Sequence, residues 1–161
     1  MNIVTFCTPV SVAAPKLWMV SLYYNTKTKD SFDNAKMGVL QLLAPSQKNL
    51  VPVLGKRSGY EEGYDKSAAC AKEGFPWVDA SSLVLDASSK MDLLPECASY
   101  IQLKWLSSTP AGDHDVALCE VVSTGVWDAE QQRVVTSAET SVPLDLDRAL
   151  YTGLLRSEGI I

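Results

Sequence analysis

Residues 99–122 read SYIQLKWLSSTPAGDHDVALCEVV, and this stretch decides the class of fold. Apolar and polar side chains alternate over 99–106, a period of two that predicts a β-strand with one face in water. The proline and glycine of 107–115 predict a loop. The almost continuous apolar run at 116–122 then predicts a second strand. The stretch therefore favours a mainly β protein.

Strand-like segments recur along the rest of the chain. The run LWMVSLYY at 17–24 is apolar on both alternating sets of residues, which predicts a strand covered on both faces. Pro9 lacks a backbone donor, so the apolar pieces on either side of it predict an edge strand or a strand that leads into a bend. Further strands are expected at 37–43, 123–128 and 132–137.

Short helices are expected between the early strands. Thr28 or Asp30 can act as the N-cap of one helix. Asp65 can cap a clearer helix over 66–73, and Gly74 follows it where a left-handed residue is needed. With many strands and few helices, residues 1–161 are predicted to form one domain, either a β-barrel or an antiparallel α+β sheet.

Composition narrows the classes of function. Of the 161 residues 47% are hydrophobic, enough to fill one core without disulfides or metal. The net charge of −5 argues against a partner held through its phosphate backbone, so no nucleic-acid partner is expected. No apolar run reaches the roughly 18 residues of a membrane span and no targeting segment is evident, so we expect a cytoplasmic protein with no membrane partner.

Familiar catalytic motifs are missing from the sequence. The glycine spacings of a P-loop and of a Rossmann turn do not occur, and no G-x-S-x-G motif presents a nucleophilic serine. With one histidine and no C-x-x-C pair, no metal site is expected. Any chemistry must therefore be carried in another way.

Three stretches remain as candidate sites. Thr28 lies between Lys27 and Lys29 at a helix start, where amides, hydroxyls and ammonium groups suit a phosphate monoester. The sequence GKRSG at 55–59 places two basic residues and a hydroxyl between glycines, which suits phosphate or a carbonyl. The only histidine, His114, is suited to proton relay. Each has a plainer reading as a capped helix, an exposed turn and a solvated histidine.

Taken in order, these stretches resemble the flavin-reductase-like family of the FMN-binding split barrel. Residues 8–15, with the strand and loop that follow, resemble the family's first flavin-contacting segment. Gly112-Asp113-His114 and the strand after it resemble its second and most specific signature, and the LYTG run at 150–153 resembles its C-terminal segment. The resemblance spans nearly the whole chain.

The resemblance implies a split β-barrel, antiparallel and Greek-key, with a few short helices. It also implies a homodimer that binds FMN, with FAD as a second option, near the subunit interface. Members of the family carry a strand or two before the segment that begins here at Asn2, so the first strand of the barrel is expected to be missing.

Site residues are carried over by position. Those expected to meet the edge of the isoalloxazine are Thr8, Val10 and Ser11. Those expected to hold the phosphate are Thr26, Lys27, Thr28 and Ser31. A loop over the cofactor is expected from Lys56, Arg57 and Ser58, and His114 is expected to face the flavin and the nicotinamide as the catalytic residue.

The function implied is an FMN-dependent oxidoreductase that passes electrons from NAD(P)H to a flavin, a protein or another acceptor. A cofactor that carries the redox chemistry explains why few catalytic side chains are evident. Two alternatives remain open. One is an FMN-binding carrier, sensor or electron relay without nicotinamide chemistry, and the other is a split barrel that binds haem with His114 as axial ligand.

Overall fold

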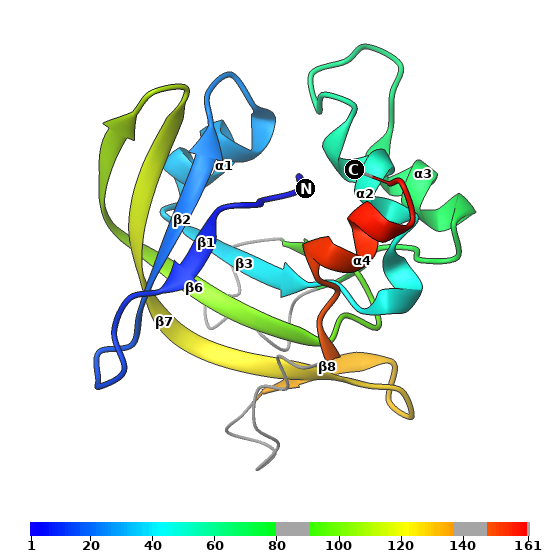
Figure 1. The fold of residues 1–161 in the computed structure, drawn as a ribbon. Coiled ribbons are helices and arrows are strands. Elements are labelled where there is room, and N and C mark those ends of the chain that lie inside the picture. The colour runs from blue at the N-terminus through cyan, green and yellow to red at the C-terminus, as the bar shows by residue number, and fades with distance from the viewer. Residues whose placement is uncertain (80–90, 137–147, 161) are drawn as a thin grey trace.

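A computed structural model describes residues 1–79, 91–136 and 148–160 and shows a mainly β protein with short helices (Figure 1). The main sheet is antiparallel and has six strands in the order β1-β2-β7-β6-β3, with β8 beside β7. Its strands are β1 (Cys7–Pro9), β2 (Leu17–Tyr23), β3 (Met37–Leu42), β6 (Ser99–Ala111), β7 (His114–Asp128) and β8 (Arg133–Thr136). The short strands β4 (Val78–Asp79) and β5 (Asp92–Leu93) form a separate pair.

Helices connect and flank these strands. They are α1 (Lys27–Ala35), α2 (Leu50–Gly55), α3 (Lys66–Lys72) and α4 (Thr152–Ser157), with a 3-10 turn, η1, at Pro45–Gln47. Asp65 caps α3 and Gly74 follows at φ +92°, as the sequence predicts. Within the described residues, none of the helices is both long and apolar enough to span a bilayer.

The two longest described strands, β6 and β7, form a hairpin at the centre of the sheet. This hairpin shows that the loop predicted at 107–115 is wrong. Residues 107–115 are not a loop, because β6 continues through Pro110 to Ala111 and β7 begins at His114. Gly112 adopts φ +65° and lets two residues reverse the chain. The strand β3 pairs only with residues 99–104, so Pro110 lies where no described strand pairs with that edge of β6, and a missing donor there costs little.

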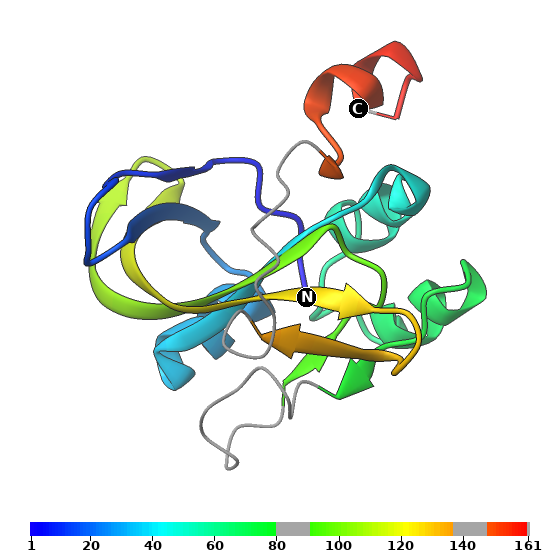
Figure 2. The same cartoon turned by 90° about the horizontal axis from the view of Figure 1, so that it is seen from below.

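The sheet bends strongly along its length. The register of β6 against β7 shifts between Gln102 and Leu103 and again between Trp105 and Ser107, and such bulges curve a strand. Figures 1 and 2 show the two long strands wrapping around the N-terminal segment. Among the described strands, the pairing order ends at β1 and β3, which do not pair with each other. The described sheet is therefore open.

Two apolar clusters fill the molecule. One lies on the sheet, where Val20 and Leu22 pack with Ile101 and Leu103. The other joins α2 and α3 to the far end of β6 through Leu50, Leu54, Cys70 and Tyr100. The prediction that 17–24 is covered on both faces is wrong for the described chain, because Met19 and Tyr23 on the second face are 39% and 52% exposed.

Candidate functional site

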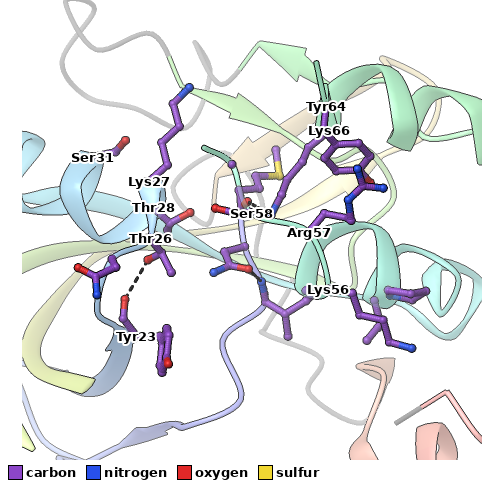
Figure 3. A pocket seen from close by; sticks show the side chains of 18 of the residues that line it. Tyr23, Thr26, Lys27, Thr28, Ser31, Lys56, Arg57, Ser58, Tyr64 and Lys66 are labelled. Atoms are coloured by element: carbon purple, nitrogen blue, oxygen red, sulfur yellow. Dashed lines mark hydrogen bonds between the residues drawn. The ribbon is translucent and has the colours of Figure 1, made fainter. Parts of the chain in front are cut away.

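A cavity of about 1000 Å³ separates α1 from the α2–α3 pair, and the N-terminal segment runs between them. This volume is at the upper end of small-molecule sites, which span about 300–1000 Å³. Figure 3 shows Thr26, Lys27, Thr28 and Ser31 on the wall formed by α1, and Lys56, Arg57, Ser58, Tyr64 and Lys66 on the opposite wall.

The structure brings most of the predicted site residues together here. The predicted residues that line the cavity are Thr26, Lys27, Thr28, Ser31, Lys56, Arg57, Ser58 and His114. They come from three separate parts of the sequence. Their convergence in one cavity is the strongest feature of the candidate site.

Three predicted residues do not line the cavity. Ser11 serves the turn between β1 and β2, where its hydroxyl donates to Pro15 O at 2.7 Å and accepts from Leu17 N at 2.8 Å. Thr8 pairs with Met19 on the edge strand, and Val10 is exposed. The residues that enter the cavity from this part of the chain precede β1; they are Met1, Asn2, Ile3 and Thr5. The sequence signal that could have identified this segment was the presence of two polar residues, Asn2 and Thr5, within an apolar stretch.

The first turn of α1 forms an end of the cavity suited to anions. Thr26, rather than Thr28 or Asp30, is the N-cap, and its Oγ1 accepts from Lys29 N at 3.3 Å and donates to Tyr23 O at 2.9 Å. The backbone N–H groups of the first turn lack partners inside the helix. Within the described chain, the hydroxyls of Thr28 and Ser31 and the ammonium group of Lys27 also have no hydrogen-bond or ion-pair partner.

Lys29 does not belong to this end of the cavity, although it was predicted to flank the anion site. Its Nζ pairs with Asp33 one turn along α1 and with Asp115 of β7 at 3.3 Å. The hydrogen bond to Asp33, followed by the one to Asp115, raises the pKa of Lys29. The lysine is thus neutralised inside the fold and joins α1 to β7.

The opposite wall carries the second group of cations. The guanidinium of Arg57 makes two hydrogen bonds to the Glu61 carboxylate and stacks 4.2 Å from the centroid of the Tyr64 ring. Lys56 has no ion pair within the described chain. Lys66 was not predicted, because in the sequence it looks like an ordinary first residue of a helix. It is buried, and its Nζ donates to Leu54 O at 2.6 Å and Met1 O at 3.3 Å.

The charge of the cavity opposes that of the whole chain. Among side chains, its lining holds the four basic residues Lys27, Lys56, Arg57 and Lys66 and one carboxylate, Asp65. That carboxylate is committed to the α3 cap, where it accepts from Ser67 N at 2.8 Å and Ala68 N at 3.2 Å. Burial lowers the pKa of Lys66, as expected for a cation out of water. A protein of net charge −5 therefore concentrates positive charge at one cavity, which attracts anions.

His114 lies at the edge of the cavity on the β6–β7 hairpin. Its Nδ1 lies 2.6 Å from Asp113 Oδ1, and Nε2 has no hydrogen-bond partner among the residues that the structure describes, so Nε2 is the ring atom that can meet a ligand. The rings of Tyr23 and Phe6 meet the imidazole edge to face, with centroids 5.2 Å and 5.9 Å away. The imidazole is therefore held in one orientation by its neighbours.

Comparison with known proteins decides the family. Residues 2–144 match the model of the flavin reductase like domain. The chain belongs to the flavin reductase-like family. No curated protein matches it by sequence.

Solved structures share the flavin reductase fold. An FMN-binding protein from Thermus thermophilus, with bound p-hydroxybenzaldehyde, is 25% identical at a TM-score of 0.57, and the match covers 78% of this chain and 62% of that one. An NADH:FAD oxidoreductase from Streptomyces globisporus C-1027 is 16% identical at a TM-score of 0.56, and the match covers 80% of this chain and 67% of that one. The styrene monooxygenase flavin reductase of Pseudomonas putida S12 is 18% identical at a TM-score of 0.56, and the match covers 78% of this chain and 70% of that one. The matched part of this flavin reductase-like chain covers 62% of the length of the Thermus thermophilus protein, which is less than two thirds, and 67% and 70% of the other two.

Proposed function

We propose that this protein is an FMN-dependent oxidoreductase that takes electrons from NAD(P)H and passes them through FMN to a free flavin, a protein or another acceptor. The observation that supports this most directly is that the anion end of the cavity and His114 line the same space. The family and the printed functions of its solved relatives agree with this proposal.

The residues present fit a flavin mononucleotide. Thr28, Ser31 and Lys27, together with the first amides of α1, offer the unused donors and the charge that a phosphate monoester requires. The cavity is large enough for the ring and for part of a second ligand. When bound, the isoalloxazine supplies a group that accepts and releases hydride, so the protein needs only to bind, orient and tune it.

The chain's own side chains then have distinct roles. Lys27, Thr28 and Ser31 hold the phosphate, and Lys56 and Ser58 cover the cofactor from the opposite wall. His114 presents Nε2 at the side where the nicotinamide enters, and Asp113 and Tyr23 keep the imidazole in place. Thr26 acts indirectly, because its hydroxyl is committed to capping α1.

Binding and reduction are measured on the same preparations. Wild-type protein should bind FMN, and stopped-flow mixing with NADH or NADPH should bleach the flavin absorbance. Replacing both Lys27 and Thr28 with alanine should weaken FMN binding at least about 100-fold, since two charge-assisted hydrogen bonds of about 1.5–3 kcal/mol each are removed. Riboflavin, which has no phosphate, should bind both proteins alike, and K16A, at an exposed lysine outside the cavity, should behave as wild type.

The outcome also separates the second candidate, an FMN-binding module without nicotinamide chemistry. The FMN-binding protein from Thermus thermophilus, the relative at 25% identity, favours this alternative. If FMN binds and neither NADH nor NADPH bleaches it, the oxidoreductase proposal is wrong and the binding module stands. If FMN does not bind at all, both fail.

We further propose that two copies associate and that the curved sheet is part of a split barrel. The exposed side chains of Phe6 and Tyr23, whose rings contact His114, and of Met19, four residues before Tyr23 on β2, support an apolar contact between the copies. Light scattering after size exclusion should give twice the chain mass of 17.5 kDa. A mass of one chain at micromolar concentration would contradict the dimer.

A further inference from the structure

The loop between α2 and α3 crosses from one wall of the cavity to the other. We call residues 57–61 of this loop the strap. The backbone at Gly59 lies against α1, since a Cβ placed there would come within 3.2 Å of Lys27 Cβ. The phenol of Tyr60 donates to the Asp30 carboxylate. Lys27 and Asp30 are three residues apart and share one face of α1, so both contacts fall on the same side of the helix.

Internal bonds give the strap a defined shape. Ser58 makes two contacts across it: its Oγ accepts from Tyr60 N and its carbonyl from Glu61 N, both at 3.2 Å. Arg57 is bonded to Glu61 and stacks on Tyr64, whose hydroxyl donates to Val53 O of α2 at 3.2 Å. The strap is thus anchored to α2 at one end and to α1 at the other.

The position of the strap matters because Lys27 contacts both the cavity and the strap. It lines the anion end of the cavity, and it is also the residue on which Gly59 packs. A phosphate bound at the first turn of α1 therefore lies beside the strap. The phosphate of FMN is the end of the molecule, whereas FAD continues from that phosphate into a second phosphate and an adenosine.

We propose that the strap makes this site selective for FMN over FAD, with Gly59 closing the space beyond the phosphate and Tyr60 fastening it to Asp30. This inference rests on the proposed flavin site and deepens it. Removing the Tyr60 hydroxyl breaks one of the two contacts between the strap and α1, so the strap can move away from the phosphate and make room for the adenylate half of FAD. The Asp30 carboxylate raises the pKa of Tyr60, so the phenol remains a donor.

The test compares dissociation constants of FMN, FAD and riboflavin for the whole chain, by quenching of flavin fluorescence. Wild type should bind FMN about tenfold or more tightly than FAD. Y60F and D30A should each reduce this ratio at least about threefold by strengthening FAD binding. D30N keeps an acceptor oxygen for the phenol and should keep the ratio. Y151F, at an exposed tyrosine outside the cavity lining, is the matched control.

Each outcome decides something. Equal affinity of wild type for FMN and FAD overturns the selectivity and leaves the flavin site intact. A ratio that stays the same in both Y60F and D30A also overturns it, because thermal melts show whether these surface variants are folded. Absence of binding by any flavin removes the proposed function, and the inference falls with it.

Discussion

The rings of Tyr23 and His114 meet edge to face, with centroids 5.2 Å apart, where the last residue of β2 pairs with the first residue of β7. The pair depends on the two-residue turn at Gly112 and Asp113, because that turn sets which residue begins β7. Asp113 also bonds the imidazole through Nδ1. Turn, strand register and ring contact together place the histidine at the cavity.

Replacing His114 with alanine should affect chemistry more than binding. We expect the rate of flavin reduction by NAD(P)H to fall about 100-fold, the scale of one positioned proton-transfer or orienting group, with FMN affinity changed less than about threefold. Stopped-flow absorbance gives the rate and fluorescence quenching gives the affinity. K16A, at an exposed lysine outside the cavity, serves as the control. An unchanged rate in H114A would show that the histidine is not catalytic.

Replacing Lys29 with methionine should destabilise the protein by breaking the link between α1 and β7. The side chains of Lys29 and Asp115 are only 12% and 14% exposed, so the loss should exceed that of a surface pair and reach about 1–3 kcal/mol. Because the pKa of Lys29 is raised, its contribution is present at neutral pH and is lost as pH rises through that raised value. Urea unfolding measures it, with K16M as the exposed control; equal midpoints would contradict the prediction.

Lys66 should make stability depend on alkaline pH. Burial lowers its pKa below the ordinary value of 10.5, so between the two values the unfolded chain binds more protons than the native one. Stability should therefore rise with pH through that window in wild type, relative to K66M, which lacks the group. Urea midpoints of both proteins from pH 7 to 10.5 give the difference. Parallel profiles would mean that the ammonium group is not desolvated in the native state.

The hydroxyl of Tyr100 should contribute measurably to the free energy of unfolding, because one oxygen atom makes two hydrogen bonds. It donates to Leu94 O at 2.6 Å and accepts from Cys97 N at 3.2 Å, and the residue is fully buried. Y100F leaves both backbone groups without a partner and should cost about 1–3 kcal/mol of unfolding free energy. Y151F, at an exposed residue, should change stability by less than about 0.5 kcal/mol. Chemical denaturation of the two variants compares them directly.

Sequence alone was sufficient where the signal is local. The strand over 99–106, the Asp65 cap and the left-handed Gly74 each depend on neighbouring residues, and each is present in the structure. The prediction that one face of 99–106 lies in water is wrong for 99–103, which are all buried; Gln102 there accepts a hydrogen bond from Ser123 Oγ at 2.8 Å. Lys27 and Thr28 were recognised for the same reason, since they lie at a helix start, whereas Thr26 and Ser31 were carried over from the family resemblance. The cap itself was predicted at Thr28 or Asp30, two or four residues after the true cap at Thr26, because all three side chains have an oxygen that can accept from a backbone N–H.

Contacts between distant residues were decided only by the tertiary structure. Asn2 and Thr5 line the cavity in place of Thr8, Val10 and Ser11, because the register of β1 on β2 sets where the chain enters. The burial of Lys66 depends on α2 and α3 packing together, and the bond from Tyr60 to Asp30 joins residues thirty positions apart. Local pattern thus determined which segments are strands, helix starts and basic turns, whereas packing and register determined which of them share one cavity.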